Sequence, residues 1–550
     1  ERIATLEFDR KPDQINGSAV VFNVSLNPQE TYEVCVTLHC LIKDGRGNGR
    51  ERGNGKGDGG TGTIGIDRAY AMVDLDRAGS VPGCRIISPS RRFNNLIDRS
   101  HADLHMLETK TKYGPYPYAG IPWFSTVFGR DGIITSMEAL WINPEIAKGV
   151  LHYLASTQSD EDDPDNDAEP GKILHESRLG EMAMSGEIPF KRYYGSIDST
   201  PLFVMLAGMY YQRTADKEMA KTLWPNVERA LEWMDNYGDI DGDGFIEYRR
   251  RSPNGLVNQG WKDSYDSVSH SDGSDAEPPI ALCEVQGYAY AAKRYASELA
   301  FVLGKADKAE GLRRGARELK ERFNDTFWCD EIGTYAMALD GKKRLCRIKT
   351  SNAGHCLFTK VASDSHARQI CRGLMARDMF SGWGIRTLGS EEVLYNPMSY
   401  HNGSIWPHDN ALIAQGLAEY GFKDETCSVL TGMYDTSMHV DLNRLPELFC
   451  GFHKREGQGP TLYPVACSPQ AWASAAIFML LQACLGLGIN APRRQVRFDK
   501  PTLPDMLASL TIENLKVGDA SVDLSLLRQE EDVGVHILRR HGELEVLVVK

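Results

Sequence analysis

The segments PLFVMLAGMYYQR (201–213) and KEMAKTLWPNVERALEWMDNY (217–237) decide the fold class of this 550-residue chain. Their apolar residues recur at helical spacing, and comparable segments follow one another over residues 92–490 with Gly-, Pro- and Asp-rich loops between them. Roughly a dozen helices fit this stretch, which is the number that a double ring of six inner and six outer helices needs. We therefore expect a mainly α fold in which residues 92–490 form an (α/α)6 barrel. The clearest other helical segments are 94–108, 287–303, 306–327, 408–421 and 469–486.

Both ends of the chain have the period-two alternation of half-buried strands. Residues 1–43 contain SAVVFNVSL and TYEVCVTLHC, which predict the end of an N-terminal β-sandwich domain. Residues 44–91 begin with twenty residues of little besides glycine and charge, so we expect a Gly-rich linker followed by an extended segment. Alternation returns in residues 491–550 and predicts a small C-terminal β-domain. The barrel should thus be flanked by small β-sandwich-like segments.

The composition narrows the classes of partner. The net charge of -13 argues against nucleic acid or an anionic membrane, because both require a basic surface. No apolar run approaches the roughly 18 residues of a membrane span. The 12 cysteines form no CxxC pair and no histidine cluster has zinc spacing, so we expect reduced thiols, a cytoplasmic enzyme, and no metal or organic cofactor. The chain begins at Glu1 within strand-like sequence, so we expect a missing N-terminus, and a signal peptide stays an open alternative.

Aromatic and charged residues of the helical region gather in its loops rather than on helix faces. Loops on a rigid scaffold are where binding and catalytic sites are built. These loops mix Trp or Tyr with carboxylates, Arg and His, which suits a sugar, since its apolar faces stack on rings while its hydroxyls need fixed donors and acceptors. The segments are PWFSTVFGRDG (122–132), GKILHESRLGEM (171–182), RYYGSIDSTP (192–201), NQGWKDSYDS (258–267), GWGIRT (382–387), YNPMSYHNGSIWPHDN (395–410), LPELFCGF (445–452) and CSPQAW (467–472).

Glycoside hydrolysis needs two carboxyl groups, one protonated to donate to the leaving oxygen and one ionised to act on the other face of the sugar. Residue type alone does not choose the pair. The loop carboxylates that qualify are Asp131, Glu176, Asp198, Asp263, Asp266, Glu284, Asp409 and Glu447.

The motifs resemble those of the amylo-α-1,6-glucosidase type of protein, the glucosidase half of glycogen debranching enzymes. More distantly they are similar to glucoamylase, trehalase and processing α-glucosidases, which share the (α/α)6 barrel. The resemblance covers about residues 90–490, and its most specific parts are LPEL followed by CxxQAW, and the WxD of GWKD. It implies that Asp263 is the general acid and Glu447 the general base. The chain departs from the debranching enzymes because no transferase domain precedes the expected barrel, so their linkage preference does not carry over.

The same resemblance implies the residues that contact the terminal sugar. Arg130 and Asp131 of the GRD motif would bind its hydroxyls, since a guanidinium paired with a carboxylate gives bidentate recognition. Apolar walls would come from three tryptophans, and three further residues would contribute more weakly. The tryptophans are Trp123, Trp261 and Trp406, and the further residues are Tyr400, His401 and Asp198.

Several of these residues have a structural alternative. Asp263 could cap a following helix, which would leave Asp266 as a rival acid, and Glu447 after Pro446 could lie in a helix first turn. Arg130 and Asp131 could be only an ion pair. His401 could be a hydrogen-bonded loop histidine, and for Glu284 the sequence does not decide between a place near the site and a structural bond.

The stretch DIDGDGFIE (239–247) begins like a calcium loop. An EF-hand requires a bidentate Glu where this chain has Arg250, so we expect a turn stabilised by Asp side chains, with Glu247 as a possible completion of another kind of ion site.

These observations predict an inverting, exo-acting glycoside hydrolase that cleaves a terminal α-glucosidic bond of an oligosaccharide or small α-glucoside. The two carboxyl groups should then stand about 6.5–9.5 Å apart. One alternative is a hydrolase or phosphorylase acting on another sugar. In a phosphorylase, phosphate replaces the general base, so the presence of Glu447 counts against that alternative. The other is a non-catalytic carbohydrate-binding protein, against which the presence of both carboxylates counts. The sequence does not determine the oligomeric state.

Overall fold

A computed structural model describes residues 2–43, 49–51, 83–530 and 532–550 of the chain. Contacts divide the chain into two units, Glu1–Pro82 and Gly83–Lys550. The expected linker over residues 44–63 lies outside the described residues except for Gly49–Glu51. Among the described helices, none has both the length and the hydropathy of a membrane span.

The first unit consists of short antiparallel strands. β1 (Arg2–Phe8) pairs with β4 (Val36–Lys43), so that Leu6 faces Leu38, and β4 pairs in turn with β5 (Gly49–Glu51). β2 (Gln14–Asn16) and β3 (Ala19–Val21) form a separate hairpin. Strands occupy only part of each predicted run: Ala19–Val21 in SAVVFNVSL and the end of TYEVCVTLHC from Val36 onward.

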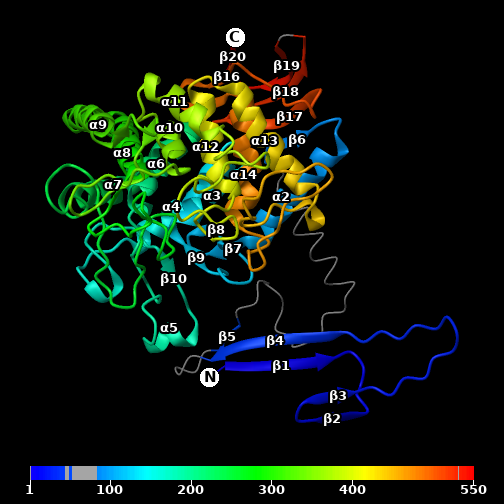
Figure 1. The fold of residues 1–550 in the computed structure, drawn as a ribbon. Helices are drawn as coiled ribbons and strands as arrows, with labels where there is room; N and C mark the ends of the chain where they lie inside the picture. The colour runs from blue at the N-terminus through cyan, green and yellow to red at the C-terminus, as the bar shows by residue number, and fades with distance from the viewer. Residues whose placement is uncertain (1, 44–48, 52–82, 531) are drawn as a thin grey trace. The chain divides into compact units, whose positions relative to one another are not determined.

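The second unit is rich in helices, and six of them form a closed ring of contacts in which each helix packs against the next and the last packs against the first (Figure 1). These ring helices are buried almost all round; in α14, for example, only Gln482 is not buried. Such helices need no polar face, which explains why their sequences have a weaker helical period than the others. The ring helices are α3 (Gly129–Ala139), α6 (Ser199–Thr214), α8 (Cys283–Val302), α10 (Asn352–Phe358), α12 (Pro407–Glu419) and α14 (Ala471–Leu485).

Six further helices pack on the outside of this ring. They are amphipathic: α9 buries Leu312, Ala316, Leu319 and Phe323, spaced three or four residues apart, and exposes the charged residues between them. Asp216, Asn143 and Ser363 cap three of these helices by accepting a hydrogen bond from a backbone N–H in the first turn. The outer helices are α2 (Arg91–Leu107), α4 (Pro144–Thr157), α7 (Lys217–Asn236), α9 (Ala306–Phe327), α11 (Asp364–Leu374) and α13 (Lys423–Ser437).

The C-terminal residues form the strands that the alternation predicts. A four-stranded sheet has the order β19-β18-β17-β6, and its last strand comes from the extended segment before the helices. A three-stranded sheet has the order β15-β16-β20. The bounds are β6 (Arg85–Ile87), β15 (Leu487–Asn490), β16 (Gln495–Asp499), β17 (Ser509–Val517), β18 (Ala520–Arg528), β19 (Val533–His541) and β20 (Glu545–Val549).

Short elements connect the ring helices. α5 (Glu181–Ser185) is a five-residue helix, and the strands between helices have two to four residues each. These strands are β7 (Glu108–Thr111), β8 (Gly114–Pro117), β9 (Val127–Phe128), β10 (Glu176–Ser177), β11 (Ala281–Leu282), β12 (Trp328–Cys329), β13 (Thr334–Tyr335) and β14 (Ala338–Leu339).

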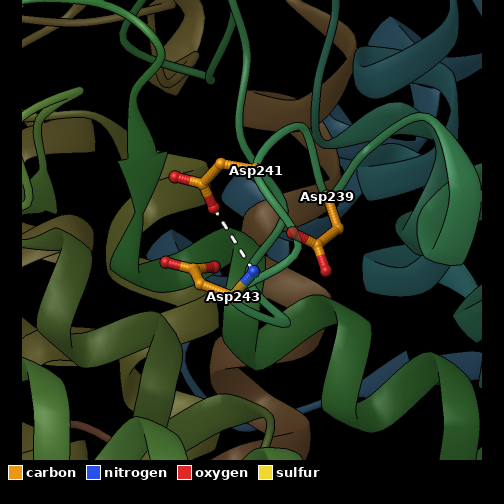
Figure 2. A group of neighbouring side chains, drawn as sticks. All are labelled: Asp239, Asp241 and Asp243. Atoms are coloured by element: carbon orange, nitrogen blue, oxygen red, sulfur yellow. Dashed lines mark hydrogen bonds between the residues drawn. The ribbon is translucent and has the colours of Figure 1, made fainter.

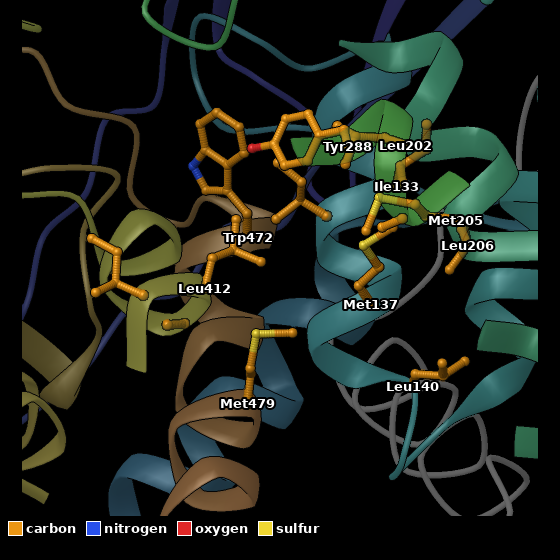
Figure 3. Packing of buried hydrophobic residues seen from close by; sticks show 14 of the residues in the cluster. Ile133, Met137, Leu140, Leu202, Met205, Leu206, Tyr288, Leu412, Trp472 and Met479 are labelled. Atoms are coloured by element: carbon orange, nitrogen blue, oxygen red, sulfur yellow. The ribbon is translucent and has the colours of Figure 1, made fainter. Parts of the chain in front are cut away.

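The interior of the ring is apolar along most of its length. Figure 3 shows Ile133, Leu202 and Met205 packed between α3 and α6, with Met137 and Met479 facing each other from α3 and α14. Burial of these side chains stabilises the ring by roughly 1.5–3 kcal/mol each. This packed interior fixes the positions of the helix ends, where the polar residues lie.

Candidate active site

Buried carboxylates lie at the N-terminal ends of four ring helices. Asp131, Glu284 and Asp409 are in the first turns of α3, α8 and α12, and Asp198 is the N-cap residue of α6. All four are buried. The unpaired N–H groups and the dipole at a helix N-terminus stabilise negative charge, so this end of the ring favours the ionised forms of buried carboxylates.

Arg130 connects three of the loops that the sequence singled out. Its Nη2 donates to Asp263 Oδ2 at 2.7 Å, while its Nη1 donates to Asp198 at 3.2 Å and to the Gly260 carbonyl oxygen at 2.9 Å. The carboxylate partners of Arg130 are therefore Asp198 and Asp263, and not the neighbouring Asp131 that the sequence suggested. Asp131 instead accepts a hydrogen bond from Gln470 Nε2 at 3.1 Å.

Glu447 lies in a loop that two donors hold in place. The Tyr400 hydroxyl donates to Oε1 at 2.5 Å, and the Cys467 backbone N–H donates to Oε2 at 2.8 Å. The side chain is 1% exposed. Since both neighbours donate and neither accepts, these two hydrogen bonds favour the ionised carboxylate over the acid.

Asp263 and Glu447 are close enough for each to influence the ionisation of the other. Burial raises the pKa of the Asp263 carboxyl, and the Arg130 guanidinium opposes that increase. Burial also raises the pKa of Glu447, with the Tyr400 hydroxyl opposing and the charge of Asp263 adding to the increase. The Asp263 side chain is 27% exposed in its ion pair with Arg130, so it can still reach a bound molecule.

Asp131 completes a group of three carboxyls. Burial raises its pKa to about 7; Arg130 opposes this, whereas Asp263 and Glu447 reinforce it. Three acids whose charges interact cannot all ionise at neutral pH without cost. Burial and the two neighbouring charges therefore favour the protonated form of Asp131.

The structural alternatives for the two principal carboxylates do not fit. No helix begins at Asp263, because the next helix starts at Cys283, and Glu447 lies in an irregular segment. Asp266 has no side-chain role in the hydrogen bonds of this loop; its carbonyl oxygen accepts from Asn402 Nδ2 at 3.1 Å. Glu176, also a carboxylate that qualified by type, pairs with Arg178 at 2.5 Å.

The aromatic residues fall into two groups. Trp261 and Trp406 are buried with ring centroids 5.8 Å apart, and His401 stacks on Trp406 at 5.1 Å. His401 Nδ1 is hydrogen-bonded to the Ser264 hydroxyl at 2.7 Å, beside Asp263. Trp123 is different: its side chain is 56% exposed, although its Nε1 donates to the Val465 carbonyl oxygen.

Sequence reasoning included Asp409 among the carboxylates that qualify by type, but it did not single out the polar neighbours of Asp409 inside the ring. Tyr288, His355 and Asp409 form a hydrogen-bonded series across α8, α10 and α12, with distances of 2.5 and 2.7 Å. Lys262 lies between the two residues of WxD that the sequence did identify. Gln470 was inside the quoted CxxQAW motif, so the motif itself was the signal that could have found it.

The calcium-like loop lies apart from this group. Asp239, Asp241 and Asp243 place carboxylate oxygens within 4.8 Å of one another (Figure 2). Lys343 Nζ forms ion pairs with Asp241 at 2.7 Å and with Asp243 and Glu247 at 2.5 Å. An ammonium group thus occupies the place that the sequence offered to an ion, and Glu247 completes a lysine site.

Comparison with solved structures shows the fold that the chain shares. A GH78 rhamnosidase of Bacillus sp. GL1 is 15% identical with a TM-score of 0.59, over 85% of this chain and 43% of the rhamnosidase. The chain thus spans less than half of that protein's length. A GH63 mannosylglycerate hydrolase from Thermus thermophilus, solved with Tris and D-glycerate, is 15% identical with a TM-score of 0.51, over 70% of this chain and 99% of that protein. No curated protein matches the sequence significantly.

The profile of one protein family matches residues 129–453, which is more than half of the chain. That range contains every ring helix except α14, together with Arg130, Asp263 and Glu447. The match supports a glycoside hydrolase and not specifically the amylo-α-1,6-glucosidase type that the motifs resemble. The chain belongs to the mannosylglycerate hydrolase MGH1-like glycoside hydrolase domain family.

Proposed function

We propose that this protein is an inverting, exo-acting glycoside hydrolase that cleaves a terminal α-glucosidic bond, and that the closed ring of helices is the inner layer of an (α/α)6 barrel. One observation supports the proposal above the others. Asp263 and Glu447 come from loops far apart in the sequence; Asp263 bonds to Arg130 in the first turn of α3, and its charge contributes to the raised pKa of Glu447.

In this mechanism Asp263 protonates the glycosidic oxygen while Glu447 activates a water molecule on the opposite face of the sugar. Arg130 orients Asp263 through Nη2, and burial favours the protonated acid. The hydrogen bonds from Tyr400 and the Cys467 N–H favour the ionised form of Glu447 against the effect of burial, and they fix the direction of its side chain. As the leaving oxygen takes the proton of Asp263, the water gives its own proton to Glu447 and its oxygen bonds to the anomeric carbon.

The sugar would bind against the same set of residues. Asp131 and Arg130 would contact hydroxyl groups, and Asp198 would hold Arg130 in position from the N-terminus of α6. Trp123 would provide an exposed apolar surface at the mouth. Trp261, Trp406, His401 and Tyr400 would form the inner wall as a packed cluster rather than as free ring faces.

The test is the configuration of the first product. One carboxyl acts as acid and the other delivers water from the opposite side, so an α-glucoside must release β-glucose first. A screen of isomaltose, maltose, trehalose, sucrose and branched dextrin with glucose as readout would find the substrate, and proton NMR of the anomeric region in the first minutes would give the configuration. Initial release of α-glucose would contradict inversion and would make Glu447 a nucleophile about 5 Å from the acid.

A second candidate is a hydrolase for a glycoside whose aglycone bears a carboxylate, such as a glycosylglycerate. The family match favours it. Activity on mannosylglycerate or glucosylglycerate that exceeds activity on every neutral disaccharide would favour this candidate; the inverse would favour the first.

A further inference from the structure

We propose that Lys262 is a positioning residue for the general acid: its ammonium group fixes the WKD loop from beneath, so that Asp263 is held at the distance its proton transfer requires. The inference rests on the proposed function, because it assumes that Asp263 is the acid. Lys262 would not touch the substrate, since its side chain is buried and its ammonium group is bonded to groups other than those that hold Asp263.

The three residues of the WKD loop are anchored in three different directions. Trp261 packs in the aromatic cluster of Trp406, His401 and His408. Asp263 bonds to Arg130 of α3. A short irregular loop that is fixed at three points has little freedom to move its middle side chains relative to the ring.

Lys262 makes the deepest of these anchors. Its Nζ donates to Asn352 Oδ1 at 2.6 Å and to the Thr387 carbonyl oxygen at 2.7 Å, and its side chain is 3% exposed. Asn352 begins ring helix α10, whereas Thr387 belongs to the GWGIRT loop. The lysine therefore joins the acid's loop to two elements that are 90 and 125 residues away along the chain.

The charge of Lys262 is also matched to its surroundings. Burial lowers the pKa of its ammonium group to about 8, and the buried carboxylates Asp409 and Glu284 oppose the decrease, with the Cys283 thiol contributing in the same direction. Neither carboxylate is within ion-pair distance of Lys262 among the described residues, and Asp409 Oδ2 and Glu284 Oε1 have no hydrogen-bond partner there. The charges of these two buried acids thus favour the charged form of Lys262.

Loss of this anchor should harm the proton donor more than the fold. A misplacement of about 1 Å at a reacting group can lower a rate by about 100-fold. An apolar side chain in place of Lys262 would leave the Asn352 amide oxygen and the Thr387 carbonyl without their donor, and the loop would relax away from them. Asp263 would move with it, while Glu447, held by Tyr400 and Cys467, would stay.

The experiment separates proton donation from all other roles by changing the leaving group. Lys262→Met is assayed on the best glycoside and on the α-glycosyl fluoride of the same sugar, because fluoride leaves with little protonation whereas an alkoxide requires it. We expect kcat to fall by about 10- to 100-fold on the glycoside and by less than about 3-fold on the fluoride, with little change in KM. Lys423→Met is the matched control, because its ammonium group also donates to buried carbonyl oxygens, those of Ala483 and Cys484, but lies outside the loops of the site.

An equal loss on both substrates would overturn the proposal and make Lys262 a structural residue, and so would unchanged activity on both. If Lys262→Met does not fold, Asn352→Ala removes one acceptor and keeps the lysine, and the same unequal loss is expected at smaller size. Failure of the proposed function would look different: wild-type protein would then hydrolyse neither the glycoside nor the fluoride, or Asp263→Asn would lose both equally.

Discussion

Two groups of carboxylates in this protein have similar composition and opposite surroundings. Asp239, Asp241 and Asp243 lie on a surface loop, and their neighbour Lys343 neutralises the group directly. Asp131, Asp263 and Glu447 meet at the N-terminal end of the helix ring, where water is largely excluded and one guanidinium serves several acids. Burial raises the pKa values of all three carboxyls of the second group.

The difference shows what makes a carboxylate cluster reactive. Solvent screens charges on an exposed loop, so a single lysine and the Asx-type backbone bonds of the turn satisfy them. At the ring end, burial raises the free energy of the charged forms, and helix N-termini with Arg130 offset only part of that increase. A glycosidase needs a carboxyl whose pKa is raised in this way, so that it can donate a proton. The same residue types at the surface only stabilise a turn.

The largest effect is expected from the two residues assigned to proton transfer. Asp263→Asn and Glu447→Gln should each lower kcat by about 100- to 10,000-fold on the best glycoside, since each removes a proton-transfer role. Both variants should remain folded by circular dichroism. Asp266→Asn is the control on the same loop and should stay within about 3-fold of wild type. Greater damage from Asp266→Asn than from Asp263→Asn would make the acid assignment wrong.

A smaller effect, on stability rather than chemistry, is expected from Asp131. Its pKa is raised in the folded protein to about 7, so the folded state holds this proton more tightly than the unfolded state does. Its stabilising contribution is then complete below about pH 4 and is lost as the pH rises through about 7. The asparagine of the Asp131→Asn variant does not titrate, so the variant does not undergo this loss. The difference in free energy of unfolding, variant minus wild type, should therefore increase between pH 4.5 and pH 8, by at most about 4 kcal/mol.

Urea unfolding of wild type and Asp131→Asn at several pH values would measure this difference. Activity should fall in the variant, since Asp131 is assigned to a sugar hydroxyl. A difference in stability that is flat with pH would mean that Asp131 ionises normally, and the contrast between the two carboxylate groups would then be much weaker than we infer.

The smallest effect on activity is expected at the surface group. Lys343→Met leaves the buried Glu247 without its donor, which should lower the free energy of unfolding by about 1–3 kcal/mol, and activity should be unchanged. Millimolar calcium should leave the melting temperature of wild type unchanged and raise that of Lys343→Met, because the metal would replace the missing ammonium group. Calcium stabilisation of the wild type would contradict the lysine site.

The sequence motifs and the structure agree most closely in the loops. WKD, GRD, LPEL and CxxQAW bring together the side chains of Asp263, Arg130 and Glu447, and Gln470 comes with them. The pairing of Arg130 could not be inferred, because the adjacent Asp131 was the nearest acid in the sequence, whereas helix geometry directs the guanidinium towards Asp198 and Asp263. Adjacent residues on a helix point in directions about 100° apart.

The sequence by itself determined the clearest helical segments, the C-terminal strands and the loops in which aromatic and charged residues gather, because hydrophobic period and residue type are local properties. Only the tertiary structure decided which helices form the inner ring, that Lys343 occupies the calcium-like loop, and that Lys262 reaches Asn352 and Thr387. These facts depend on contacts between segments some 90 to 339 residues apart, and on burial, which changes the charge state of an acid without any change in its sequence.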